Sequence, residues 1–326
     1  MSRGAAFAIR VFDWPFEALQ RVLGAARMPY VFVAPNLLVF GIFVAAPMIL
    51  NVWYAVTGGT ALMPGERPYV GASNFGELLD CGVYIVVATC RQDRFWRAVA
   101  NTSWFVAFQV VGLVGVSLLT ALILNRRMPW RGFFRAVFFY PVLLSPVVVA
   151  LIWKWLLQPD GVLNAVVVAN GGARVPFLLD PGWAFASTVV ISIWAHMGFY
   201  TLILLAGLQA IPADLYEAAE MDGTPHWRVF WRITLPLLMP NMLVVLVLGL
   251  IRAVQSFDEI FVLTGGGPGT ATQYIVQYIY ETAFANQTHI LGLAAAASIL
   301  VGGVLMLLTL LQLAASAWAG REGAKR

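Results

Sequence analysis

Charged side chains are scarce in this sequence: Asp, Glu, Lys and Arg make up 11% of its 326 residues, and apolar residues make up 60%. Apolar residues are usually about 45 to 50% of a soluble protein. The composition therefore excludes an ordinary soluble globular protein and indicates an integral membrane protein. The formal net charge is only +4, and membrane topology explains it without a nucleic-acid partner.

Two further scarcities limit the chemistry. The phosphate-binding pattern GxxxxGK[ST] occurs nowhere, so the chain has no loop of that kind to bind nucleotide phosphates. The segment GGGPG at 265–269 lacks the lysine, and we interpret it as a tight external turn or a contact for a binding protein. The sequence has two cysteines and three histidines, and we expect no catalytic residue, no metal site and no cofactor bound by this chain.

Long apolar runs are abundant. A membrane-spanning helix needs about 20 mostly apolar residues. Six runs meet this requirement: 32–56, 103–124, 136–157, 184–208, 237–257 and 290–317. They are continuous and rich in Leu, Val and Ala, whereas the strands of a membrane barrel alternate apolar and polar residues. The sequence therefore predicts an all-α polytopic membrane bundle of six transmembrane helices.

Arginine and lysine are concentrated in alternate loops. Residues 125–135, NRRMPWRGFFR, contain four arginines and no acid. Because cytoplasmic loops retain basic residues, we expect both termini to face the cytoplasm. The predicted domains are a cytoplasmic amphipathic segment 1–28, with a solvated tail as its alternative, a transmembrane domain 29–320 with an extracytoplasmic loop 57–97 and a cytoplasmic loop 209–236, and a cytoplasmic tail 321–326.

Both cysteines, Cys81 and Cys90, lie in the predicted extracytoplasmic loop. In an oxidising compartment they could form a disulfide. Closing so short a loop would stabilise it by about 2 to 3 kcal/mol. Two unpaired thiols packed against apolar neighbours are the alternative, and the sequence leaves both states open.

The cytoplasmic loop contains EAAEMDGTPHWRVFWRITLP at 217–236. Its first part predicts a short helix with Pro212 in the first turn and Gly223 as the stop. Thr224 then predicts an N-cap with Pro225 at N1 of a second short helix. Acids on the first helix would be repelled by an anionic inner leaflet. This helix therefore suits a protein partner better than the lipid headgroups.

These residues resemble the EAA loop in membrane subunits of ATP-binding-cassette importers. The shared pattern is EAA, a glycine shortly after it, and an apolar residue before Leu-Pro. In this sequence the pattern falls at Glu217, Ala218, Ala219, Gly223, Ile233, Leu235 and Pro236. Residues 257–284 are also similar to the carbohydrate-uptake branch that contains maltose- and glycerol-phosphate-type permeases.

The resemblance implies a type I permease fold in the bacterial cytoplasmic (inner) membrane. It also implies that the loop docks as a coupling helix into a cytoplasmic ATPase, whose closure around ATP and Mg turns the bundle from inward-open to outward-open. The implied docking residues are Glu217, Ala218, Ala219 and Gly223, with Arg228 and Arg232 as flanking contacts. The implied partners are a second homologous permease, two ATPase subunits and an extracytoplasmic solute-binding protein that delivers a sugar, oligosaccharide or polyol.

Polar side chains within the spans are candidate solute contacts, because ionisable groups at membrane depth are costly. The candidates are Arg252, Gln255, Ser256 and Asp258 on the fifth span and Trp194, His196 and Tyr200 on the fourth. The spacing would place part of the fifth-span set on one helix face. An ion pair of Arg252 with Asp258 or Glu259, and a helix-packing hydrogen bond of His196, are the structural alternatives.

Other functions stay open at this point. Arg252 keeps glycerol 3-phosphate or another anionic sugar derivative among the solutes. An ion-driven secondary transporter would favour inverted repeats and buried acids, and the spans contain almost no acids. A membrane scaffold without transport is the third alternative.

Overall fold

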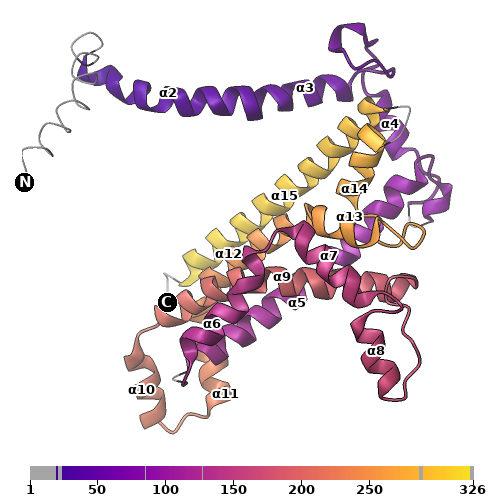
Figure 1. The fold of residues 1–326 in the computed structure, drawn as a ribbon. Coiled ribbons are helices and arrows are strands. Elements are labelled where there is room, and N and C mark those ends of the chain that lie inside the picture. Colours follow the sequence, from indigo (N-terminus) through magenta and orange to yellow (C-terminus); the bar gives the residue numbers. More distant parts are fainter. Residues whose placement is uncertain (1–19, 21–23, 85, 127, 286–288, 324–326) are drawn as a thin grey trace, which may run out of the picture.

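A computed structural model describes residues 20, 24–84, 86–126, 128–285 and 289–323 (Figure 1). Within these ranges the structure is helical, and the only bridges are the isolated pairs Thr57–Tyr69 and Cys81–Cys90. Most of the predicted segment 1–28 and residues 324–326 of the predicted tail lie outside the described residues. Six described segments are long and apolar enough to cross a membrane: Ala25–Ala55, Asp93–Asn125, Pro146–Ala169, Pro181–Gln209, His226–Val254 and Leu291–Ala314. The predicted all-α bundle of six transmembrane helices is confirmed.

Two long helices, α5 (Asp93–Asn125) and α9 (Pro181–Gln209), form the centre of the bundle. Helix α9 begins at Pro181, where the Asp180 side chain accepts from the N–H groups of the first turn, as an N-cap residue does. Helix α12 (Leu235–Val254) packs on both long helices. A Cβ at Gly207 of α9 would lie 2.6 Å from Asn241 of α12. Close packing here therefore requires glycine.

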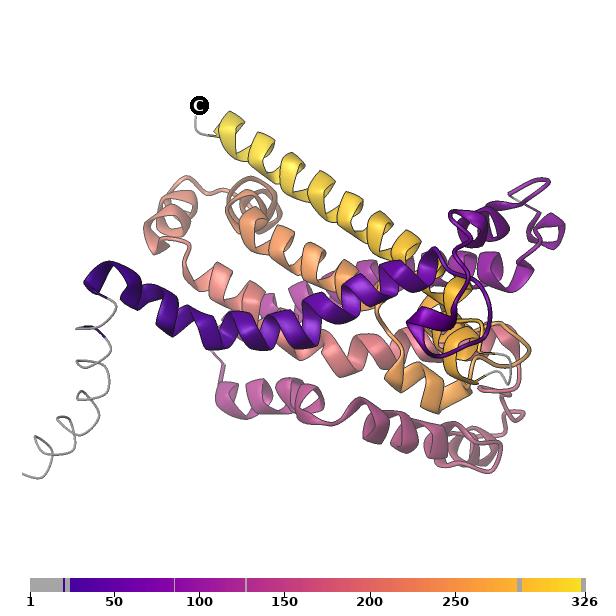
Figure 2. The same ribbon diagram turned by 90° about the horizontal axis from the view of Figure 1, so that it is seen from above.

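The first membrane segment stands apart from this centre. It consists of α2 (Met28–Phe40), a π-helix over Gly41–Ala45 and α3 (Ala46–Ala55). Helix α3 packs on the start of α15 (Leu291–Gly323), where Asn51 Nδ2 donates to Ser298 Oγ at 2.9 Å. Both views show the indigo α2 diverging from the yellow α15 beyond this contact (Figures 1 and 2).

The third predicted span, 136–157, is wrong as a single helix. Helix α6 (Arg131–Phe139) ends in a 3-10 turn at Tyr140–Leu143, and α7 (Pro146–Leu157) begins after it. Pro141 and Pro146 lack the N–H groups that a continuous helix would need. The membrane-crossing segment instead starts at α7 and continues into α8 (Val162–Ala169).

The fifth predicted span, 237–257, is displaced. The observed segment begins eleven residues earlier, at His226, and ends at Val254. A turn then leads to α13 (Asp258–Thr264), which packs on α7. The other short elements are α4 (Ser73–Leu79), α10 (Ala213–Met221), α11 (His226–Val229), α14 (Ile275–Tyr280), 3-10 turns at Ala25–Arg27, Pro64–Glu66 and Val87–Thr89, and π-helices at Phe230–Thr234 and Glu281–Ala285.

Candidate functional site

The loop between the fourth and fifth membrane segments carries α10, which closes on Gly223. Gly223 has a φ of 65°, in the left-handed region that favours glycine. Its N–H donates to Glu220 O at 3.0 Å, and the N–H of Thr224 donates to Ala219 O at 2.9 Å. These two bonds form the Schellman motif, which satisfies the last carbonyls of a helix. Gly223 therefore ends α10, as the sequence predicts.

The second helix of this loop begins later than predicted. Thr224 is not its N-cap residue, because the helix starts one residue further along the chain than predicted. Helix α11 begins at His226, and Pro225 occupies the N-cap position without a side-chain bond. The π-helix at Phe230–Thr234 then joins α11 directly to α12. The loop is therefore continuous with the fifth membrane segment.

The residues implied for docking divide between two surfaces. Glu217, Ala218 and Gly223 are exposed, whereas Ala219 is only 7% exposed and faces the protein. Arg228 and Arg232 are exposed on the second half of the loop. Glu217 and Ala218 thus form the accessible part of the EAA pattern, and Ala219 packs inward.

Two side-chain contacts hold α10 in place. Tyr216 OH lies 3.1 Å from Thr234 Oγ1 and so links α10 to the foot of α12. With the Gln209 amide oriented so that its oxygen faces the guanidinium groups, Arg131 and Arg135 donate to it at 2.8 and 2.9 Å. Gln209 is the last residue of α9. Sequence reasoning used these two arginines only to assign topology, and it missed their contact with the base of the loop.

A second polar group lies at the opposite end of α12. Arg252 Nε and Nη2 lie 3.3 and 3.1 Å from His196 Nε2, and Nη2 lies 3.8 Å from Glu259 Oε2. His196 Nδ1 lies 2.8 Å from the carbonyl oxygen of Ser192, which can only accept. Nδ1 therefore carries the proton, and Nε2 accepts from Arg252. The three side chains are called the Arg252 cluster below.

The Arg252 cluster faces a cavity of about 220 Å³. The break between α6 and α7 supplies much of its apolar wall. The lining residues are Pro141, Val142, Leu144, Pro146, Val149, Ala195, His196, Arg252 and Glu259. Apolar walls with a few converging polar groups are typical of small-molecule sites. The cavity can therefore hold a small polar solute.

The structure brings together only part of the predicted fifth-span set. Helix α12 ends at Val254, so Asp258 starts a new helix and is exposed, and Gln255 is exposed as well. Ser256 is buried, and its hydroxyl donates to Arg252 O at 3.1 Å. Glu259, one of the two acids considered for an ion pair, is the one that pairs with Arg252. The set is divided because α12 ends at Val254 and a new helix starts at Asp258.

The three candidates on the fourth span, Trp194, His196 and Tyr200, lie in different surroundings. His196 belongs to the Arg252 cluster and connects α9 to α12. Trp194 packs edge-on against Trp153 of α7, with ring centroids 5.5 Å apart. Tyr200 is buried among leucines of α9 and α12. Only His196 of these three lines the cavity.

A third polar group, the Glu281 cluster, was missed by sequence reasoning. Arg94 Nη2 donates to Glu281 Oε2 at 2.7 Å, and Gln277 Nε2 donates to Oε1 at 2.8 Å. The Gln273 amide also donates to Oε2. Asn101 Nδ2 adds a bond to Thr270 O at 2.7 Å. These contacts fix segment 264–285, which includes the GGGPG turn, to the start of α5.

The remaining predicted feature lies in loop 57–97. Cys81 and Cys90 are joined by a disulfide with an S–S distance of 2.07 Å. Among the described residues, no group of three or more His, Cys, Asp and Glu side chains is placed to hold a metal ion.

Comparison with known proteins identifies relatives along most of the chain. Residues 113–317 match the family described as "Binding-protein-dependent transport system inner membrane component". The trehalose/maltose transport system permease protein MalF of Thermococcus litoralis is 37% identical over 77% of this chain and 81% of its own length. The sulfoquinovosyl glycerol transport system permease protein SmoG of Agrobacterium fabrum is 31% identical over 79% of this chain and 81% of its own.

A solved structure shares the whole architecture. A chain of a bacterial ABC transporter involved in the import of the acidic polysaccharide alginate superposes with a TM-score of 0.77 at 26% identity, covering 93% of this chain and 99% of that one. A second structure, of a bacterial alginate ABC transporter in complex with an alginate pentasaccharide-bound periplasmic protein, gives a TM-score of 0.72 at 25% identity, covering 90% and 95%. The chain is therefore a multi-pass membrane protein that belongs to the family of inner membrane components of binding-protein-dependent transport systems.

Proposed function

We propose that this chain, a permease subunit of an ATP-binding-cassette importer, takes up a sugar, oligosaccharide or polyol delivered by an extracytoplasmic solute-binding protein. The observation that carries the proposal is the closed, exposed α10 at the end of a bundle that matches importer permeases over 93% of its length. The chain is a transport subunit and not an enzyme. Cytoplasmic orientation of both termini and of the α10 loop is part of the proposal.

In this proposal α10 docks into an ATPase subunit, and closure of the ATPase moves the transmembrane helices from the inward-open to the outward-open state. Glu217 and Ala218 present a small acidic surface, and Arg228 and Arg232 flank it. Ala219 supports that surface from inside. Two ATPase subunits would bind and hydrolyse ATP with Mg, and a second homologous permease would complete the pathway.

The Arg252 cluster is the proposed solute contact of this subunit. Glu259 balances the charge of Arg252, and His196 accepts from it as a neutral ring. A site with no net charge suits an uncharged polyhydroxylated solute, because an unpaired anion would compete with Glu259 for Arg252. The names of the relatives, for maltose and for lactose, support a sugar.

An anionic sugar derivative, such as glycerol 3-phosphate, is the second candidate. It is favoured by one specific observation, the structural match to an importer of an acidic polysaccharide. A thermal-shift screen of the cognate binding protein against sugars and sugar phosphates separates the two candidates. Stabilisation by sugar phosphates alone would reject the uncharged solute.

Coupling is tested with the assembled importer in liposomes. Solute-loaded binding protein should stimulate ATP hydrolysis, and Glu217→Lys should abolish uptake while the chain still inserts in the membrane. Glu66→Lys is the matched control, since Glu66 is also exposed but lies in loop 57–97. Wild-type uptake by Glu217→Lys with normal ATPase binding would reject the docking role. Uptake driven by an ion gradient without ATP would reject the whole proposal.

A further inference from the structure

Two arginines of α6 converge on one neutral acceptor at the base of the α10 loop. Arg131 and Arg135 both donate to the oxygen of Gln209, at 2.8 and 2.9 Å, so their guanidinium groups are close enough to repel one another. Neither forms an ion pair with an acid in the part of the chain that the structure describes. Arg135 Nε is buried and has no hydrogen-bond partner among these residues. The two positive charges are therefore not neutralised by the described residues.

The sequence around the arginine pair adds positive charge and no acid. Residues 125–135 contain four arginines and neither Asp nor Glu. Arg126 is exposed directly after α5, and Arg131 Nε donates to Leu124 O at 2.6 Å, which holds α6 against the end of that helix. A neutral amide satisfies hydrogen bonds of a guanidinium group but does not cancel its charge. The arginine pair therefore suits an anion with several acceptor oxygens.

The arginine pair lies where membrane helices end. Gln209 is the last residue of α9, Leu124 is the last but one of α5, and both helices are long enough to cross a membrane. Figure 1 shows α6 beside these ends, at the same end of the bundle as α10. Trp130 is 78% exposed and Phe133 is 60% exposed at the start of α6. Exposed aromatic side chains are typical of the boundary between lipid tails and water.

The phosphate of an anionic phospholipid has the properties that this site requires. It carries a negative charge, and its oxygens can accept paired N–H groups from a guanidinium group. Its acyl chains keep it at the membrane surface, where exposed aromatic rings can contact them. Basic pockets at the cytoplasmic ends of membrane helices bind headgroups of this kind. A carboxylate of a soluble partner would supply the charge but would leave Trp130 and Phe133 without a contact.

We propose that Arg131 and Arg135 bind the phosphate of an anionic phospholipid. Arg126 adds charge to this site, and Trp130 and Phe133 contact the acyl chains. The bound lipid neutralises the arginine pair and fixes the base of the α10 loop. The inference depends on the proposed function only for the side of the membrane: because α10 is placed in the cytoplasm, the lipid belongs to the inner leaflet.

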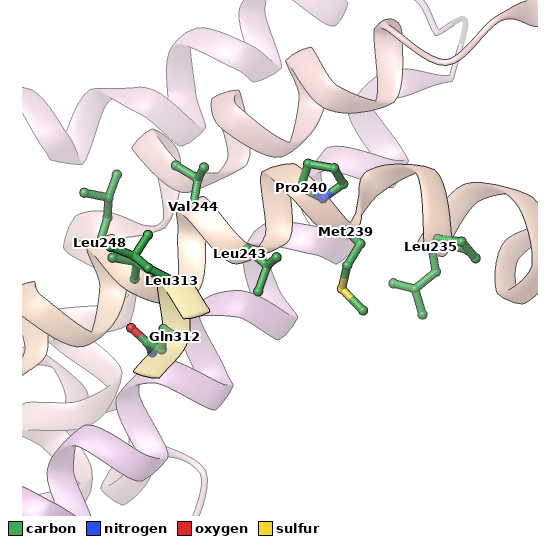
Figure 3. Close-up of a pocket in the computed structure, with 10 residues that line it drawn as sticks. Leu235, Met239, Pro240, Leu243, Val244, Leu248, Gln312 and Leu313 are labelled. Atoms are coloured by element: carbon green, nitrogen blue, oxygen red, sulfur yellow. The ribbon is translucent and has the colours of Figure 1, made fainter. Parts of the chain in front are cut away.

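The apolar groove between α12 and α15 provides a contrasting surface (Figure 3). Its volume is about 710 Å³. None of its lining side chains is charged, and Gln312 is the only polar one. Any lipid that contacts this groove is held by its tails, so the charge of the headgroup has little effect there. A preference for anionic headgroups is therefore expected from the arginine pair and not from the groove.

Native mass spectrometry of the full chain tests the proposal, in micelles that contain phosphatidylglycerol and phosphatidylcholine with matched acyl chains. The wild-type chain should bind phosphatidylglycerol at least about fivefold more than phosphatidylcholine, and Arg135→Gln should lower this ratio about fivefold, the effect of one arginine near an anionic surface. Two controls should leave the ratio unchanged: Arg174→Gln, which removes an exposed arginine that pairs with Asp160, and Val244→Ala in the groove. A wild-type ratio near one, or an unchanged ratio in Arg135→Gln, would overturn the proposal.

Thermal unfolding of the wild-type chain gives a measurement that does not depend on the folding of a variant. Phosphatidylglycerol should raise the Tm more than phosphatidylcholine does, and an excess of inorganic phosphate should not replace it. An equal shift with inorganic phosphate would show a site for a free anion and contradict the lipid. Loss of ATPase co-purification in Arg135→Gln at an unchanged lipid ratio would assign the arginines to a protein partner. Because lipid binding is measured on this chain alone, failure of ATP-driven uptake would reject the proposed function and leave this inference standing.

Discussion

Polar side chains are paired with one another at one end of the bundle and exposed at the other. At one end, the Glu281 cluster binds its own donors: Arg94, Gln273 and Gln277 all point to one carboxylate. At the other end, the acids of α10 are exposed and form no ion pair with another described residue. Paired polar groups fix an element to its own chain, and unpaired exposed ones are available to a partner. The comparison separates the fixed end of this permease from the end that is proposed to dock on the ATPase.

The largest effect is expected at Gly223. Gly223→Val should reduce uptake more than tenfold, because a β-branched residue cannot readily adopt the left-handed conformation that closes α10. Co-purification of the ATPase should fall with uptake. A Cβ at this position meets no atom within 4 Å, so the effect must come from the backbone.

The matched control is Gly223→Asn, since asparagine tolerates the left-handed region. It should keep most of the uptake. Equal loss in both variants would show that the position is limited by contact with the partner and not by backbone conformation.

A smaller effect is expected at the fixed end. Glu281→Ala leaves three donors without their acceptor and should lower the free energy of unfolding by about 2 to 3 kcal/mol. Thermal unfolding in detergent measures the change. Arg97→Ala is the control, because Arg97 and Asp93 form an exposed pair that contributes about 0.5 kcal/mol or less. Similar losses in the two variants would contradict a special role for the Glu281 cluster.

The disulfide should have a local effect of similar or slightly smaller size. Replacing Cys81 and Cys90 together by serine opens a loop with a sequence separation of 9. Chain entropy predicts a loss of about 2 to 3 kcal/mol, confined to loop 57–97. Hydrogen exchange should show faster exchange there and no change in α10. Loss of protection at both ends would mean that the two ends are not independent.

The smallest effect is expected for the Arg252 cluster. Arg252→Met leaves Glu259 buried without its partner and should destabilise the protein by about 1 to 2 kcal/mol, since Arg252 is partly exposed and solvent screens the pair. Adding Glu259→Gln should recover most of the loss. Additive losses in the thermal unfolding of the double variant would mean that the two side chains are not coupled.

The sequence predicted features that depend on local pattern. The six membrane segments follow from hydropathy, and the end of α10 follows from a single glycine, Gly223, whose conformation is local. The break at Pro141 and Pro146 was missed because the residues around it are as apolar as a continuous helix. Hydropathy measures transfer to lipid and is insensitive to helix continuity.

The polar clusters were harder to predict from the sequence because they join segments that are far apart along the chain. Arg94 and Glu281 are separated by 187 positions, so no local pattern connects them. Glu259 was considered only as a neighbour of Arg252 in sequence, and its pairing depends on the turn that ends α12. Two signals in the sequence were available. Pro141 and Pro146 inside an apolar run indicate a break in the third predicted span, and Glu259 just after the fifth span indicates a partner for Arg252.

The contact between Tyr216 and Thr234 links α10 to the start of the fifth membrane helix, so that a movement of α10 would tilt this helix. Arg252 lies 18 residues beyond Thr234, or about 27 Å along the axis. Each 5° of tilt imposed at the foot of this helix would therefore move its far end by about 2 Å. Arg252 and Glu259 are 3.8 Å apart, so a displacement of this size is comparable with the separation of the ion pair at the proposed solute site.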